Sequence, residues 1–131
     1  MKRVLGQLFK KKTPVKSKEP VHIGEWFYSL PETTPNKDGN IVLIKMVCFG
    51  PLEVYEWGIN ADNSPFEMYQ WCENEFLEDT SYNKTISWKE LEAKLSSCIK
   101  LFEQEGLIEW KSAYEEVLSW LESYKKKTGS F

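Results

Sequence analysis

The 131-residue sequence has a single histidine, His22, and three cysteines far apart from one another, Cys48, Cys72 and Cys98. A Ser-His-Asp triad or a Cys-His dyad would have to be built around His22, and a zinc site would need cysteines from separate segments. No Cys-x-x-Cys pair, nucleophile elbow, phosphate-binding loop or dinucleotide-binding glycine pattern is present. These absences predict a protein that is not an enzyme and that uses no metal and no cofactor.

Long apolar runs are also missing. No stretch approaches the roughly 18 to 20 apolar residues of a membrane-spanning helix. The apolar segment Val4–Phe9 is short and is followed at once by lysines, so it does not fit a secretory signal. Isolated cysteines in apolar surroundings are typical of buried thiols in a reducing compartment. We therefore predict a cytoplasmic protein with no stable membrane insertion.

Charge is distributed unevenly along the chain. Residues 1–18 hold seven of the 17 basic residues and no acidic one, which leaves ten basic and all 20 acidic residues in 19–131. That part has a formal net charge of −10, against −3 for the whole sequence. Such a field repels nucleic acid and attracts basic proteins, although an acidic surface also simply keeps a protein soluble. We predict a basic protein partner and no nucleic acid, and leave the oligomeric state open.

Apolar patterning predicts a single α+β domain at 21–131, preceded by a basic appendage or docked segment at 1–20. Runs rich in aromatic and β-branched residues at 23–30, 41–49 and 52–59 are separated by turn residues, and they predict a three-stranded antiparallel meander. The run at 41–49 is apolar on both faces and should be the central strand. The run at 52–59 is more mixed and should lie nearer an edge.

Three helices are predicted after the meander. The segment 64–67 reads Ser-Pro-Phe-Glu, the order of an N-cap, a first-turn proline and a capping-box glutamate, and predicts a helix over 64–79. The segment 87–90 repeats the capping box, and Gly106 ends the helix that follows. The last helix should start near Glu109 and finish at the three lysines 125–127. We expect the last two helices to form an antiparallel pair packed on the sheet.

Carboxylates are plentiful around the predicted first helix. Helical spacing puts Glu75, Glu78 and Asp79 on one side of it. Three interpretations are open: a solvated helix end, an acidic patch that binds a partner, or a metal or acid-base site. The segment 60–64 resembles the start of a calcium loop, but its sixth position is Pro65 and its twelfth is Trp71 where Gly and Glu are required, so we reject it.

Six Trp, six Tyr and seven Phe complete an acidic, aromatic-rich composition. This composition is typical of an inhibitor of a basic enzyme, because carboxylates can mimic phosphates and exposed aromatic rings anchor interfaces. In this character and in its Leu-Phe-Lys-Lys-Lys segment at 8–12, the chain resembles the immunity proteins of bacterial toxin systems. The resemblance implies direct binding and neutralisation of a cognate toxin, including toxins that act on nucleic acid.

The predicted partner-binding residues are Glu67, Glu73, Glu75, Glu78, Asp79, Tyr82, Trp57 and Trp71. Four other functions fit the same sequence: a phage anti-defence inhibitor, a small carboxylate-based enzyme, a ligand-binding domain, and an adaptor that lies on membranes through residues 1–12.

Overall fold

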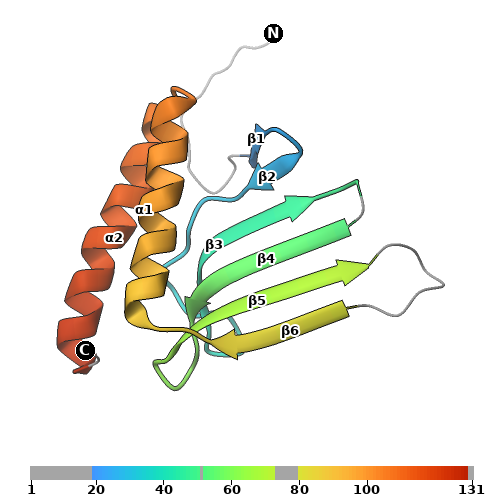
Figure 1. Cartoon of the computed structure of the whole chain (residues 1–131). Coiled ribbons are helices and arrows are strands. Elements are labelled where there is room, and N and C mark those ends of the chain that lie inside the picture. Colours follow the sequence, from blue (N-terminus) through green and yellow to red (C-terminus); the bar gives the residue numbers. More distant parts are fainter. Residues whose placement is uncertain (1–18, 51, 73–79, 130–131) are drawn as a thin grey trace, which may run out of the picture.

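The computed structural model describes residues 19–50, 52–72 and 80–129. They form a six-stranded antiparallel sheet, in which each strand pairs with the next in sequence, and a helical hairpin (Figure 1). The strands are β1 (Val21–Ile23), β2 (Trp26–Tyr28), β3 (Ile41–Cys48), β4 (Leu52–Ile59), β5 (Pro65–Cys72) and β6 (Thr80–Thr85). The helices are α1 (Trp88–Gln104) and α2 (Ile108–Thr128). The predicted α+β class is confirmed, but this part of the chain has six strands and two helices instead of three of each.

β3 and β4 occupy the middle of the sheet, between β2 and β5. Their bounds follow the runs predicted at 41–49 and 52–59, and the central position of β3 is confirmed. The expectation that 52–59 lies nearer an edge is wrong, because two further strands follow β4 in the sheet.

A β-bulge shapes the pairing of β3 with β4. The register shifts between Val42 and Ile44, so that Leu43 is an extra residue on β3. Glycine is required opposite, at Gly58, because a Cβ there would lie 1.8 Å from the carbonyl oxygen of Ile41. The bulge allows the consecutive residues Leu43 and Ile44 both to be fully buried. It also decides which residues of β3 share a face with those of β4.

The segment predicted as the first helix, 64–79, begins instead with strand β5. Ser64 is not a helix N-cap: its amide and hydroxyl donate to Asp62 Oδ1, at 3.1 and 2.6 Å, in the turn between β4 and β5. β5 is paired with β4 along its whole length and with β6 on its other side. A cap contributes only about 1 kcal/mol. Pairing on both sides of an aromatic-rich segment outweighs it.

The edges of the sheet also differ from the prediction. β6 lies in a polar stretch, Thr80–Thr85, for which no strand was predicted. Of the strand predicted at 23–30, only Trp26–Tyr28 forms a strand of its own, β2, while Ile23 is the last residue of β1. A turn at Gly24, whose φ of 65° favours glycine, separates the two. The first strand of the expected meander is therefore a short hairpin.

The two helices agree with the prediction. Ser87 caps α1 in a reciprocal box: its hydroxyl accepts from the amide of Glu90, and the Glu90 carboxylate accepts from the amide of Ser87. Gly106, with φ 73°, lies in the turn between α1 and α2. Lys125 of α2 donates to Glu92 of α1 at 2.7 Å, so an ion pair joins the antiparallel helices.

The helical hairpin packs on one face of the sheet and stands against one end of it, so that the strands extend beyond the helices (Figure 1). Tyr28 packs edge-on against Phe102, with 5.6 Å between ring centroids, and the hydroxyl of the buried Tyr114 donates to the carbonyl of Ser29 at 2.8 Å. Trp57 belongs to the same core. The remainder of this sheet face, toward the far ends of the strands, is not covered by the helices.

Two of the three cysteines are free and buried, Cys48 in β3 and Cys98 in α1. Burial raises the pKa of the Cys98 thiol to about 11. The prediction of buried thiols is confirmed for these two residues.

The predicted basic appendage at 1–20 lies outside the described residues except for Glu19 and Pro20. In the part of the chain that is described, neither helix is long and apolar enough to cross a membrane.

Candidate functional site

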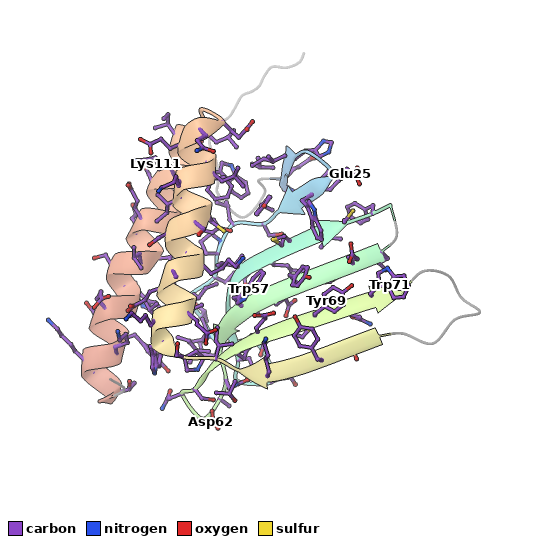
Figure 2. The ribbon with its side chains drawn as sticks, in the orientation of Figure 1. Glu25, Trp57, Asp62, Tyr69, Trp71 and Lys111 are labelled. Atoms are coloured by element: carbon purple, nitrogen blue, oxygen red, sulfur yellow. The ribbon has the colours of Figure 1, made fainter. Side chains whose placement is uncertain are left out.

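Strand register arranges the helix-side face of the sheet in rows that cross the strands. Directly opposite residues of an antiparallel pair project from the same face. The row farthest from the helices contains Trp26, Cys48, Glu53 and Trp71; the next contains Tyr28, Met46, Tyr55, Tyr69 and Tyr82; the third contains Ile44, Trp57, Glu67 and Lys84. Figure 2 shows Trp57 close to α1, with Tyr69 and then Trp71 farther out along the sheet.

We call the part of this face beyond the helices the open aromatic surface. It consists of Trp26, Glu53, Tyr55, Glu67, Tyr69, Trp71 and Tyr82. All of these side chains are partly or fully exposed.

Aromatic rings contact one another across the open aromatic surface. The ring centroid of Tyr55 lies 5.8 Å from that of Trp26 and 4.7 Å from that of Tyr69, and Tyr69 lies 5.5 Å from Tyr82. Tyr55 also stacks on the buried Trp57, at 5.3 Å with 7° between the ring planes. The series runs from β2 to β6 and is anchored in the core. Such mutual contacts hold the rings as a platform before any ligand arrives.

Two carboxylates of the surface are held in place by tyrosine hydroxyls. Tyr69 donates to Glu53 Oε2 at 2.7 Å, and Tyr82 donates to Glu67 Oε2 at 2.5 Å. Desolvation, followed by the hydrogen bond to Glu53, raises the pKa of Tyr69 to about 12. The hydrogen bond to Glu67, followed by desolvation, raises the pKa of Tyr82 to about 12. Both hydroxyls therefore stay protonated at neutral pH and keep orienting the carboxylates.

Two lysines of the chain lie against aromatic rings on this face. Lys94 Nζ of α1 is 4.5 Å from the centre of the Trp57 ring. Lys84 Nζ of β6 is 5.5 Å from the centre of the Tyr82 ring and 4.0 Å from Glu67 Oε1. These are cation–π distances. Among the described residues, no lysine comes within ion-pairing distance of Glu53.

A cleft of about 250 Å³ adjoins the open aromatic surface where the sheet meets α1. It is lined by Trp57, Glu67, Ile86, Glu90, Ala93, Lys94 and Ser97. A separate groove of about 310 Å³ runs between Leu30–Thr33 and α2, beside Trp120. Only the first of these hollows joins the rings and carboxylates of the sheet.

The structure places the predicted site residues as follows. Glu67, Trp71 and Tyr82 lie together on the open aromatic surface. Trp57 lies on the same face but is only 5% exposed and belongs to the core, so it is not an exposed anchor. The other four predicted residues, Glu73, Glu75, Glu78 and Asp79, lie outside the described residues.

Sequence reasoning missed Trp26, Glu53, Tyr55 and Tyr69. For the last three, the signal was alternation: Glu53 and Tyr55 are two apart on β4, and Tyr69 falls midway between the predicted Glu67 and Trp71 on β5. The assignment of 64–79 to a helix hid the position of Tyr69, because residues two apart lie on different sides of a helix and on the same side of a strand. Glu53 and Tyr55 lie in the strand predicted at 52–59, where their shared face was not used.

The site combines carboxylates with aromatic rings. Glu53 and Glu67 accept hydrogen bonds from tyrosines, and no group of three His, Cys, Asp or Glu side chains is positioned to hold a metal ion within 19–50, 52–72 and 80–129. His22 lies on the edge strand β1, pairs with Phe27 and stacks on it, at 4.3 Å between ring centroids. The arrangement offers flat aromatic faces and oriented carboxylates, which suit a cationic or hydrogen-bond-donating ligand.

Comparison of the chain with protein-family models, with curated protein sequences and with solved structures gave no significant match.

Proposed function

We propose that the chain is a protein-binding inhibitor that neutralises a basic partner, of the kind represented by the immunity proteins of bacterial toxin systems. The open aromatic surface is the binding surface. The observation that carries this proposal is the part of the sheet face that the helices leave uncovered (Figure 1), where partly exposed aromatic rings surround Glu53 and Glu67. The protein acts in the cytoplasm, beside a partner that would otherwise be active there.

Charge supports a basic partner. Residues 19–131 have ten basic and 20 acidic residues, and Glu53 has no lysine partner among the described residues. Complementary charge steers encounter and rejects partners of the wrong sign. A carboxylate held by a tyrosine hydroxyl keeps its position in the free protein, which lowers the loss of side-chain entropy on binding.

Aromatic content supports a protein interface. Trp and Tyr, together with Arg, are the residues that most often dominate binding energy at interfaces. Trp71 and Tyr69 are two residues apart on β5, project from this face and are partly exposed. An interface that covers these side chains removes exposed apolar area from water.

Capture of a partner, followed by an activity assay, tests the proposal. The tagged full chain is used to capture proteins from its native cell, and the activity of each captured protein is measured against increasing amounts of the chain. We expect one basic protein whose activity is abolished at a one-to-one ratio. Captured proteins that retain full activity in the presence of excess chain would contradict an inhibitory function.

Matched variants locate the interface. Trp71→Ala and Tyr69→Ala should each weaken binding by about 30-fold or more, the effect of losing an interface hot spot of at least about 2 kcal/mol. Gln70→Ala is the control, since Gln70 lies between them on β5 and projects from the opposite face. Equal losses for Gln70→Ala and Trp71→Ala would place the interface elsewhere.

A further inference from the structure

We propose that the open aromatic surface contains a seat for a single guanidinium group, so that the partner presents an arginine side chain to it. The seat is formed by the rings of Tyr55, Tyr69 and Trp71 and by the carboxylate of Glu53. This inference rests on the proposed function and adds the chemistry of the partner residue that the surface recognises.

The first support is a carboxylate with no ion-pair partner among the described residues, next to partly exposed rings. Glu53 pairs across the sheet with Trp71, and its carboxylate accepts the hydroxyl of Tyr69. Glu67, in contrast, has Lys84 within 4.0 Å. Glu25 adds a second negative charge at this end of the sheet: its carboxylate reaches to 4.0 Å from the thiol of Cys48, the residue that pairs with Glu53 on β3. Figure 2 shows Glu25 and Trp71 at the same end of the sheet, away from Lys111 on the helices.

The second support comes from the chain's own cations. Lys94 covers Trp57 and Lys84 lies against Tyr82, so the platform already binds ammonium groups at two of its rings. Tyr55 and Tyr69 lie between those rings in the series and have no cation over them among the described residues. A cation from another molecule that binds Tyr55 and Tyr69 would repeat the contacts that Lys94 makes with Trp57 and Lys84 makes with Tyr82.

The geometry favours arginine over lysine. A guanidinium is planar, so it stacks on an aromatic face and at the same time makes paired hydrogen bonds to a carboxylate at the edge of the ring. Aromatic rings with a carboxylate fixed beside them allow both the stacking and the paired hydrogen bonds. An ammonium group has no planar face to stack and is attracted only through its charge. Sugars also stack on flat aromatic rings, but they do not need a carboxylate whose charge is left without an ion-pair partner. A negatively charged nucleic acid is repelled by Glu53 and Glu25.

Peptide titration of the full chain tests the seat. The probe is a blocked Gly-Arg-Gly-Arg-Gly peptide, and its comparisons are the same peptide with lysine or with citrulline, the uncharged isostere of arginine. Binding is followed by the NMR signals of the tyrosine and tryptophan rings. We expect saturable shifts with the arginine peptide, roughly three- to tenfold weaker binding with lysine and none with citrulline. Equal binding of the arginine and citrulline peptides, or binding of a soluble β-glucan oligosaccharide in preference to both, would overturn the proposal.

Four variants, one of them a control, identify the groups involved. Glu53→Gln should weaken the arginine peptide by roughly three- to tenfold, and Tyr69→Phe, which keeps the ring but not the hydroxyl, should weaken it less. Glu56→Gln is the control on the same strand, because Glu56 projects from the other face and pairs with Lys45. Arg3→Gln tests whether Arg3, the one arginine in the sequence, itself occupies the seat. A gain in peptide affinity with that variant would assign the seat to the N-terminal segment and overturn the inference.

The outcomes separate the seat from the function. Binding of the arginine peptide without any neutralised partner would leave the seat standing and contradict the proposed function. Binding of a neutralised partner that is weakened by Tyr69→Ala but undiminished by Glu53→Gln would support the function and overturn the seat.

Discussion

Replacement of Gly58 by alanine tests the strand register on which the open aromatic surface depends. The new Cβ would lie 1.8 Å from the carbonyl oxygen of Ile41, 2.9 Å from its carbonyl carbon and 3.0 Å from the Cα of Val42. All three atoms belong to the backbone of β3, so no side chain can rotate away. A carbon and an oxygen normally stay about 3.3 Å apart, and β3 and β4 would have to separate locally by about 1.5 Å.

This separation has an energetic consequence. Overpacking a core by a methyl group costs about 1 to 3 kcal/mol when side chains can adjust. We expect Gly58→Ala to lie at the upper end, near 3 kcal/mol, because ladder hydrogen bonds must stretch as well. For a domain of this size, that loss lowers the melting temperature by about 10 °C.

Urea unfolding followed by circular dichroism measures the effect. The midpoint should fall while the slope stays unchanged, since a lower midpoint at constant slope reports a loss of stability. Gly50→Ala is the control: a Cβ at Gly50 meets only the Cys48 sulfur, at 3.9 Å. If Gly58→Ala were as stable as Gly50→Ala, the bulge at Leu43 would be misplaced. A register slip of one residue would then move the side chains of β3 to opposite faces.

Three further predictions follow from individual contacts. Folded-state pKa values of about 12 for Tyr69 and Tyr82 lie above the unfolded value of about 10. The stability that these two hydroxyls contribute is therefore complete below about pH 10 and is lost between about pH 10 and 12. A tyrosinate absorbance titration in which both ionise near pH 10 in the folded protein would refute this. Ser87→Ala should lower the free energy of unfolding by about 1 kcal/mol, and an unchanged urea midpoint would show that the cap is not formed. Glu92→Gln should lower it by about 0.5 to 1 kcal/mol through loss of the bond to Lys125, and the difference from wild type should shrink in high salt.

The helical half of the fold was predictable because its signals are local. The capping box at 87–90, the glycine at 106 and the apolar spacing between them fall within one helix and need no information from elsewhere in the chain. The central strands were predictable for a similar reason: 41–49 is long, β-branched and apolar on both faces, which only a covered strand explains.

The second half of the sheet was not predictable in the same way. The segment 64–67 has a genuine helix-start pattern, and only pairing with β4 and β6 makes it a strand. β6 is a polar edge strand with no apolar alternation, so its own residues do not indicate a strand. Local preferences of about 1 kcal/mol are overruled where long-range pairing is extensive.

The candidate site was predictable only in part, because its geometry depends on the same long-range strand pairing. Trp71, Tyr82 and Glu67 were predicted from acidity and aromatic content, and they do lie on one surface. The reason is strand alternation, not the side of a helix. Glu53 and Tyr69 emerged only when the register placed them in neighbouring rows.

Fluorine NMR of the chain labelled with fluorotryptophan tests the central claim most directly, because it reports six positions at once. Signals are assigned with single Trp→Phe variants, and the arginine peptide is added in steps. We expect saturable shifts of Trp71 and Trp26 on the open aromatic surface, with Trp110 in the core and Trp120 of α2 unchanged. Shifts of Trp120 with an unchanged Trp71 would contradict this expectation and would move the binding site to the groove between Leu30 and α2.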